Sequence, residues 1–225
     1  TEEEKRFLAQ LGEYLDLPED LRLLALDSRT QLVLRDAFDL VTGDGVLDDN
    51  ELAQLRLLQK QLGRSFVMSD DDRATFQRAR LVWTIKHAPK LEPLESVALK
   101  LAEGEVCYVH RPASFIELPR ATRPLLNGKE RRAKLTSGAY WHTEIGDVAG
   151  PQHVRDAGEV FLTNRHLWLD GRKENSKLGL HQIEDFDACP AWVDIRCERG
   201  KMLRLTVTKH ADVFAHYLAR VLRDL

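Results

Sequence analysis

The residues best suited to chemistry lie in one acidic stretch in the first half of the chain, at positions 38–52. Its four carboxylates are those of Asp39, Asp44, Asp48 and Glu51. Calcium is a hard cation that takes several oxygen ligands held at short spacing around a sharp turn. The stretch is therefore a candidate calcium site, and these four residues are its candidate ligands.

The second half of this stretch resembles the calcium-binding loop of an EF-hand. In that comparison Gly45 makes the sharp turn, Leu47 is the apolar position and Glu51 is the bidentate ligand. The first half departs from the pattern, because Leu40 stands at the first ligand position and Asp39 reaches it only with one residue inserted. The loss of an anionic first ligand weakens calcium binding severely.

The same carboxylates also have a purely structural interpretation. Asp44 and Gly45 are a turn-forming pair, and Asp48 with Glu51 has the spacing of a capping box at the start of a helix. We favour this turn and cap, and we keep a calcium-responsive module as the alternative. Stabilisation by millimolar calcium distinguishes the two, because a ligand of the folded state raises its stability.

Patterns that carry catalysis are missing elsewhere in the sequence. It contains no G-x-S-x-G, P-loop, H-E-x-x-H or C-x-x-C motif. Cys107 and His110 lie three residues apart on an expected strand, where side chains alternate between faces, so they cannot chelate one ion. We therefore expect no catalytic residue and no cofactor, and an enzyme without a recognisable motif is the third hypothesis.

Composition limits the kind of partner. The 225 residues include 31% charged side chains but a net charge of only -3, so no overall field attracts nucleic acid. Three cysteines favour reduced thiols over a disulfide framework. No apolar run approaches the roughly 18 residues of a membrane span. We expect a cytoplasmic protein, either free or peripheral to the membrane.

One local patch departs from this even balance of charge. Between Arg111 and Lys134 the chain carries seven basic and two acidic residues. The candidate anion-binding or partner-binding residues within it are Arg120, Arg123, Lys129, Arg131, Arg132 and Lys134. Such a patch attracts anionic lipid or phosphate, although Lys and Arg also protect the exposed edges of sheets. Both interpretations stay open.

The elements that hold these residues begin with a helical part over positions 1–88, where apolar residues recur at helical spacing. Pro18 opens one helix, and Ser28 with Gln31 has the spacing of a capping box that opens the next, which ends at Gly43. Two further helices follow the acidic stretch. We predict a compact bundle of four or five helices.

The turn in the acidic stretch and the helix after it carry a short motif. Its residues are Asp44, Gly45, Leu47, Glu51, Leu52, Leu55, Leu62 and Gly63. The motif resembles the repeated helix pair of the TerB-like, tellurite-resistance-associated helical domains. This resemblance implies an all-helical fold for residues 1–88 and no particular ligand.

The second part of the chain follows a linker that we place at residues 89–103, because its prolines break helical periodicity. Apolar residues then alternate, which predicts strands at about residues 105–110 and, separately, around Phe115. Two further alternating runs, 193–197 and 203–207, predict a strand pair. The chain ends in an amphipathic helix that we expect Thr208 to cap.

The run GEVFLTNRHLWLDG at residues 158–171 contains two apolar strands that meet at Asn164 and Arg165, which predicts a β-hairpin. This run resembles the hairpin of GRAM and bacterial PH-like domains. The resemblance implies a PH-superfold domain over residues 104–225, a partly open antiparallel β-barrel plugged at one end by the C-terminal helix. The expected fold class is therefore α+β, a helical bundle followed by this barrel.

Domains of the PH superfold bind lipid headgroups or peptides through loops at the open end of the barrel. The resemblance thus implies a non-enzymatic binding or scaffolding module. We expect it to dock a protein partner, with an anionic membrane surface as the alternative and no nucleic acid. The oligomeric state stays open.

Overall fold

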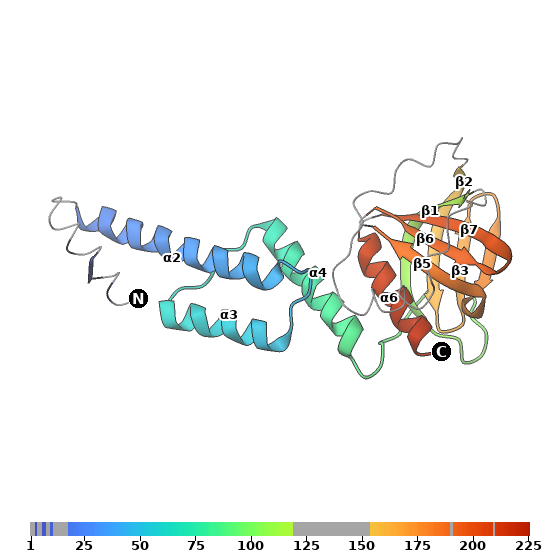
Figure 1. Cartoon of the computed structure of the whole chain (residues 1–225), viewed down its shortest axis with the longest axis horizontal. Helices are drawn as coiled ribbons and strands as arrows, with labels where there is room; N and C mark the ends of the chain where they lie inside the picture. The colour runs from blue at the N-terminus through green and yellow to red at the C-terminus, as the bar shows by residue number, and fades with distance from the viewer. Residues whose placement is uncertain are drawn as a thin grey trace. The chain divides into compact units, whose positions relative to one another are not determined.

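The computed structural model describes residues 3, 6, 7, 10, 18–118, 154–189, 191–208 and 210–225. The chain divides into two compact units, Thr1–Trp83 and Thr84–Leu225. The first unit is helical, and the second is built on an antiparallel sheet with a C-terminal helix (Figure 1). The α+β class predicted from the sequence is therefore confirmed. No helix in the described part of the chain has the length and apolar character to cross a membrane.

Three helices form the described part of the helical unit. They are α2 (Glu19–Thr42), α3 (Asp49–Leu62) and α4 (Asp70–His87), the last of which runs on into the second unit. Figure 1 shows α2 and α3 side by side, and they share a core of Leu34, Phe38, Leu55 and Phe66. Burial of these side chains, rather than helix propensity, holds the helices together.

The break predicted within α2 at Ser28 and Gln31 is wrong, because the helix continues without interruption from Glu19 to Thr42. Gln31 does not cap a helix here. Its side-chain amide donates to the Ser65 carbonyl at 3.1 Å and accepts from the Val67 N–H at 3.1 Å. Gln31, whose spacing from Ser28 suggested a helix cap, therefore makes long-range contacts instead.

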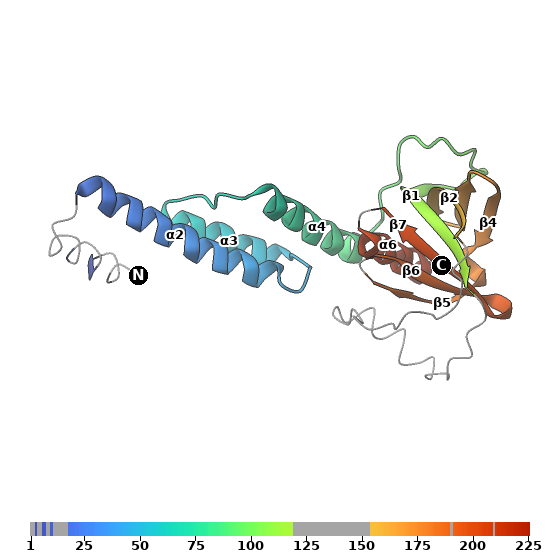
Figure 2. The same cartoon turned by 90° about the horizontal axis from the view of Figure 1, so that it is seen from above.

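Seven antiparallel strands form the sheet of the second unit, in the order β4-β3-β2-β1-β7-β6-β5. Figure 2 shows the edge strands β4 and β5 apart from each other. Their bounds are β1 (Cys107–Leu118), β2 (Val154–Thr163), β3 (His166–Gly171), β4 (Asn175–Gly179), β5 (Ile183–Ala188), β6 (Val193–Cys197) and β7 (Lys201–Val207). Among the described strands, β4 and β5 each pair on one side only, so the sheet is open. The hairpins predicted for β2 with β3 and for β6 with β7 are confirmed.

The prediction of two separate strands before residue 118 is wrong, because β1 runs unbroken through Pro112. On one side Pro112 lies opposite Glu159 of β2. On the other side the register with β7 begins only at Ala113, and the Pro112 carbonyl accepts from the Thr208 N–H at 3.0 Å. A proline is tolerated at the end of a ladder, where its missing N–H breaks no internal bond.

The C-terminal helix α6 (Ala211–Arg223) buries its apolar face against β1, β5, β6 and β7. The cap predicted at Thr208 is wrong. The backbone N–H of Thr208 is held by Pro112, and α6 starts three residues later, after His210 in the left-handed conformation (φ 61°). No side chain caps this end of the helix.

Two arginines of α6 contact the chain that enters the second unit: Arg223 reaches the Lys86 carbonyl at 3.5 Å, and Arg220 makes the other contacts. The Arg220 guanidinium, itself 8% exposed, donates to the carbonyls of Ile85 and Lys86 at 3.2 Å and of Pro89 at 3.4 Å. Its Nε also pairs with Asp224 at 2.6 Å. The last carbonyls of a helix lack intrahelical partners, so Arg220 satisfies those of α4 with a favourable charge.

Candidate functional site

The carboxylates considered for calcium serve the local fold. Asp48 Oδ1 accepts from the Glu51 N–H at 2.7 Å, and Glu51 Oε2 accepts from the Asp48 N–H at 2.9 Å, so the predicted capping box is present. Asp44 Oδ1 accepts from the Val46 N–H at 2.9 Å, and Asp39 is exposed on α2. Among the described residues, no three acidic, histidine or cysteine side chains form a group that could hold a metal ion.

The basic candidates belong to the connection between β1 and β2. These residues are Arg120, Arg123, Lys129, Arg131, Arg132 and Lys134, and all of them lie outside the described residues. Their role as an anion-binding or partner-binding patch stays a prediction from the sequence.

The three cysteines, Cys107, Cys189 and Cys197, are free and buried. Burial raises the pKa of Cys107 and of Cys197. Thiols in such surroundings stay protonated at neutral pH and are poor nucleophiles.

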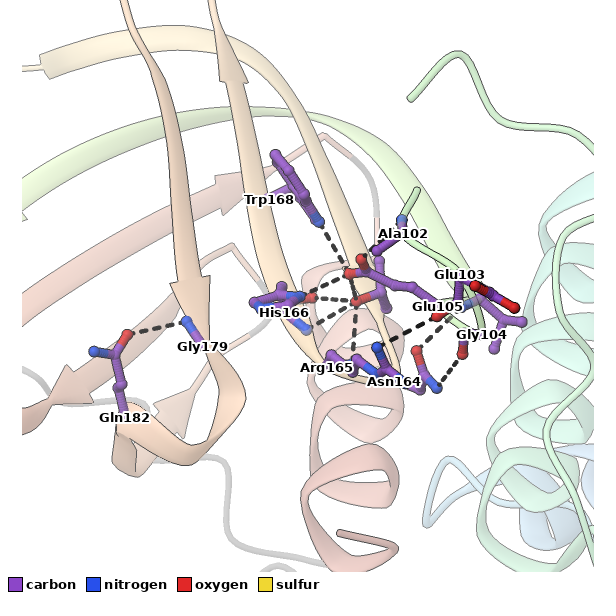
Figure 3. A network of polar contacts seen from close by, with 12 residues as sticks. Ala102, Glu103, Gly104, Glu105, Asn164, Arg165, His166, Trp168, Gly179 and Gln182 are labelled. Carbon is purple, nitrogen blue, oxygen red and sulfur yellow. Dashed lines mark hydrogen bonds and ion pairs between the residues drawn. The ribbon is translucent and has the colours of Figure 1, made fainter. Parts of the chain in front are cut away.

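A polar cluster in the described part of the second unit surrounds Glu105, two residues before β1 (Figure 3). Its side chain is fully buried, and three side chains of the β2–β3 hairpin approach the same oxygen, Oε1. The distances are 2.7 Å from the Thr163 hydroxyl, 2.8 Å from His166 Nδ1 and 3.2 Å from Trp168 Nε1. Because an ionised carboxylate only accepts, His166 donates from Nδ1.

The hairpin explains why these donors converge. His166 and Trp168 are two residues apart on β3, so their side chains leave the same face of the sheet. Thr163 ends β2, and its hydroxyl oxygen accepts from the N–H groups of Arg165 at 3.1 Å and His166 at 2.8 Å. The turn of the hairpin thus fixes the orientation of the Thr163 hydroxyl.

The tip of the hairpin also contacts the backbone around Glu105. Asn164 donates from its side chain to the Gly104 carbonyl at 3.1 Å and accepts from the Val106 N–H at 3.0 Å. A guanidinium nitrogen of Arg165 lies 3.4 Å from the Glu103 carbonyl. Residues 103–106 are therefore held through both their backbone and the Glu105 carboxylate.

Electrostatics keep Glu105 ionised. Burial alone would raise the pKa of its carboxyl, but the hydrogen bonds from Thr163, His166 and Trp168 outweigh burial and lower the pKa from 4.5 to about 2. The buried group therefore carries its negative charge at neutral pH. The sequence contained no spacing signal for this cluster, because 58 residues separate Glu105 from Thr163.

A second feature that sequence reasoning missed is an exposed apolar stripe on α2. Leu21, Leu24 and Leu32 are 46%, 61% and 55% exposed, and their spacing places them on one side of the helix. Asp36 and Asp39 continue this side toward the end of the helix and are also exposed. We call these five residues the outer face of α2.

The open edges of the sheet are less suited to binding than this face. On β5 the Asp185 carboxylate accepts from the Phe186 N–H at 2.9 Å, and β4 exposes Lys177. The occupied N–H group and the edge lysine discourage the addition of a further strand at these positions.

Comparison of the chain with protein-family models gives no match, and neither does comparison with curated proteins.

Proposed function

We propose that the chain is a non-enzymatic binding module in which the outer face of α2 docks an amphipathic helix of a protein partner. The observation that carries this proposal is the exposure of Leu21, Leu24 and Leu32 on one side of a regular helix. Aligned exposed leucines are uncommon on soluble surfaces and mark interaction sites when they form a contiguous patch.

The pattern of the outer face specifies the chemistry of the partner. Its apolar positions follow the helical period, as in the pairing of one amphipathic helix with another. Asp36 and Asp39 place negative charge beyond the last leucine. The matching partner helix therefore carries an apolar stripe followed by Lys or Arg, because complementary charge fixes direction and register.

Under the same proposal the second unit is a PH-superfold module and residues 1–88 are TerB-like. Seven antiparallel strands in an open sheet, with a C-terminal helix against it, agree with the fold that the GRAM resemblance implies. The TerB-like assignment rests on the motif from Asp44 to Gly63. The second unit would then act as the scaffold of the module.

Cross-linking in cell extract, with identification of the cross-linked segments, tests the docking surface. The variant combines Leu21→Gln, Leu24→Gln and Leu32→Gln, and the matched control combines Leu40→Gln with Leu57→Gln, which are exposed leucines elsewhere. We expect a cross-linked segment with an amphipathic basic helix that the variant loses and the control keeps. Retention of the same segment by the variant would contradict the proposal.

Two further outcomes would replace this partner with another. Concentration-dependent self-association in sedimentation, lost in the leucine variant, would make a second copy of the chain the occupant. Binding to anionic liposomes that is lost on combining Lys129→Glu, Arg131→Glu and Arg132→Glu would move the function to the basic stretch between β1 and β2.

A further inference from the structure

We infer that Thr163, His166 and Trp168 form a carboxylate-binding site built into the β2–β3 hairpin and filled in cis by Glu105. The inference is independent of the proposed docking surface, because it concerns other residues and another unit of the chain. Its ligand class is a carboxylate, supplied either by an acidic residue of a peptide segment or by a small organic acid.

The donors converge on one point. A hydroxyl, an imidazole and an indole N–H all lie within 3.2 Å of Glu105 Oε1, whereas the other oxygen has one long contact, 3.4 Å from the Ala102 N–H (Figure 3). Hydrogen bonds to an ionised oxygen are the strong ones. Three donors from one hairpin thus make a site that prefers an anion to a neutral group.

Contacts within the sheet position these donors without help from Glu105. The Thr163 hydroxyl oxygen is held by two N–H groups of the turn. The His166 and Trp168 rings meet edge to face with centroids 6.1 Å apart, and the Lys177 ammonium lies 4.2 Å from the Trp168 ring centroid. The site should therefore persist when the Glu105 side chain is removed.

The tip of the hairpin adds selectivity for a segment that leaves a tight turn, because the Glu105 N–H donates to the Ala102 carbonyl at 3.0 Å and Gly104 has a φ of 73°. Asn164 contacts the backbone on both sides of Glu105, and Arg165 reaches the Glu103 carbonyl. Main-chain contacts on both sides of a side-chain site give affinity for a peptide, and the side-chain site gives specificity. A Glu-Gly-Glu-Val segment, the sequence of residues 103–106, with its glycine in the left-handed conformation, is thus the natural form of the ligand.

The test removes the cis occupant and supplies a carboxylate in solution. In the 225-residue chain carrying Glu105→Ala, replacing chloride by acetate at equal ionic strength should raise the midpoint of thermal unfolding. When acetate exceeds its dissociation constant about tenfold, the folding equilibrium constant rises about tenfold, which corresponds to roughly 3–5 °C for a chain of this size. Wild type, whose site is filled, should not respond beyond the general effect of the salt.

Two controls separate site binding from general salt effects. Adding Thr163→Val to Glu105→Ala removes one donor and should abolish the extra rise in acetate. In a ¹⁵N-labelled sample, the indole N–H signal of Trp168 should move on Glu105→Ala and return toward its wild-type position with acetate, which general stabilisation does not produce. If Glu105→Ala does not fold in chloride, its refolding yield in acetate is compared with its refolding yield in chloride, and this comparison replaces the midpoint of thermal unfolding.

A peptide that carries the carboxylate, compared with acetate, distinguishes the two possible sources. Acetyl-Glu-Gly-Glu-Val amide acting at lower concentration than acetate would assign the site to an acidic peptide segment, and acetate acting at the lower concentration would assign it to small organic acids. The inference is overturned if neither compound changes Glu105→Ala more than it changes wild type and the Trp168 signal stays displaced.

Discussion

Helices α2 and α6 are both rich in leucine and valine, but only α6 buries its apolar side chains in one layer. Phe214 and Leu218 of α6 are almost completely buried against four strands, whereas Leu21 and Leu24 of α2 remain about half exposed. The apolar residues of α6 gather on one side, so a single sheet covers them. Those of α2 surround the helix, and its core neighbour α3 covers only one side.

The difference shows that apolar content alone does not decide burial. Along α2, Leu34 and Phe38 lie in the core, while Leu32 lies outside it. An apolar side chain is buried when it lies on the side of the helix that faces a neighbouring element. A helix with apolar residues on two sides has one face left for another molecule, which is the basis of the function proposed above.

The largest effect is expected from a substitution on the buried face of α6. Phe214→Ala should lower the free energy of unfolding of the sheet unit by about 3–5 kcal/mol, because it opens a cavity in a packed layer. Urea unfolding followed by circular dichroism measures the loss. Phe214→Leu, which keeps most of the volume, should cost less than about 1.5 kcal/mol. Equal losses in both variants would mean that α6 packs loosely.

Glu105→Gln should have the next largest effect, on the order of 3 kcal/mol at neutral pH. The pKa of Glu105 is lowered in the folded chain, so its charge stabilises the fold above the unfolded value of 4.5, and this stabilisation is lost as the pH falls toward about 2. The difference in unfolding free energy between wild type and Glu105→Gln should therefore shrink across that range. A difference that is independent of pH would refute the role of the charge.

Asp48→Ala should cost about 1 kcal/mol in the helical unit, because it removes the cap of α3. Asp48→Asn keeps a capping oxygen and should stay within a few tenths of the wild-type value. Millimolar calcium should leave the thermal midpoint of all three proteins unchanged. If calcium raised the thermal midpoint of wild type and Asp48→Ala abolished this rise, the calcium interpretation would be restored.

The smallest effect is expected from a substitution on the exposed side of α2. Leu24→Gln should change stability by no more than about 0.5 kcal/mol, because the side chain is already in water. The comparison variant, Leu34→Gln on the opposite side of the same helix, should cost more than Leu24→Gln, because it buries a polar amide in the core. Thermal unfolding of the two variants side by side checks both, and similar losses would argue against an exposed outer face.

Local rules predicted the elements whose signals are themselves local. The β2–β3 hairpin followed from alternation and a turn at Asn164, and the start of α3 followed from Asp48 and Glu51. The same local rules gave a wrong prediction at Ser28 and Gln31. Gln31 instead contacts Ser65 and Val67, which lie far from it in the sequence.

The candidate site was harder to predict than the fold. Glu105 preceded the first strand without any motif, and its partners follow about sixty residues later. Three residues of the run that carried the hairpin resemblance, residues 158–171, turn out to hold Glu105, and they are Thr163, His166 and Trp168. A hint was present in an acidic residue placed between Gly104 and the apolar start of a strand, but its partners on the β2–β3 hairpin are seen only in the folded sheet.

Arg220 has a consequence for where the chain can be divided. A fragment that started at Gly104 would keep every strand and α6, yet it would lack the carbonyls of Ile85, Lys86 and Pro89 that this guanidinium contacts. A buried cation would then keep Asp224 as its only remaining partner among these contacts, and burial of an under-satisfied charge is costly. Gene fragments intended for expression or for fusion to other proteins should therefore begin no later than Thr84, so that the end of α4 travels with the sheet.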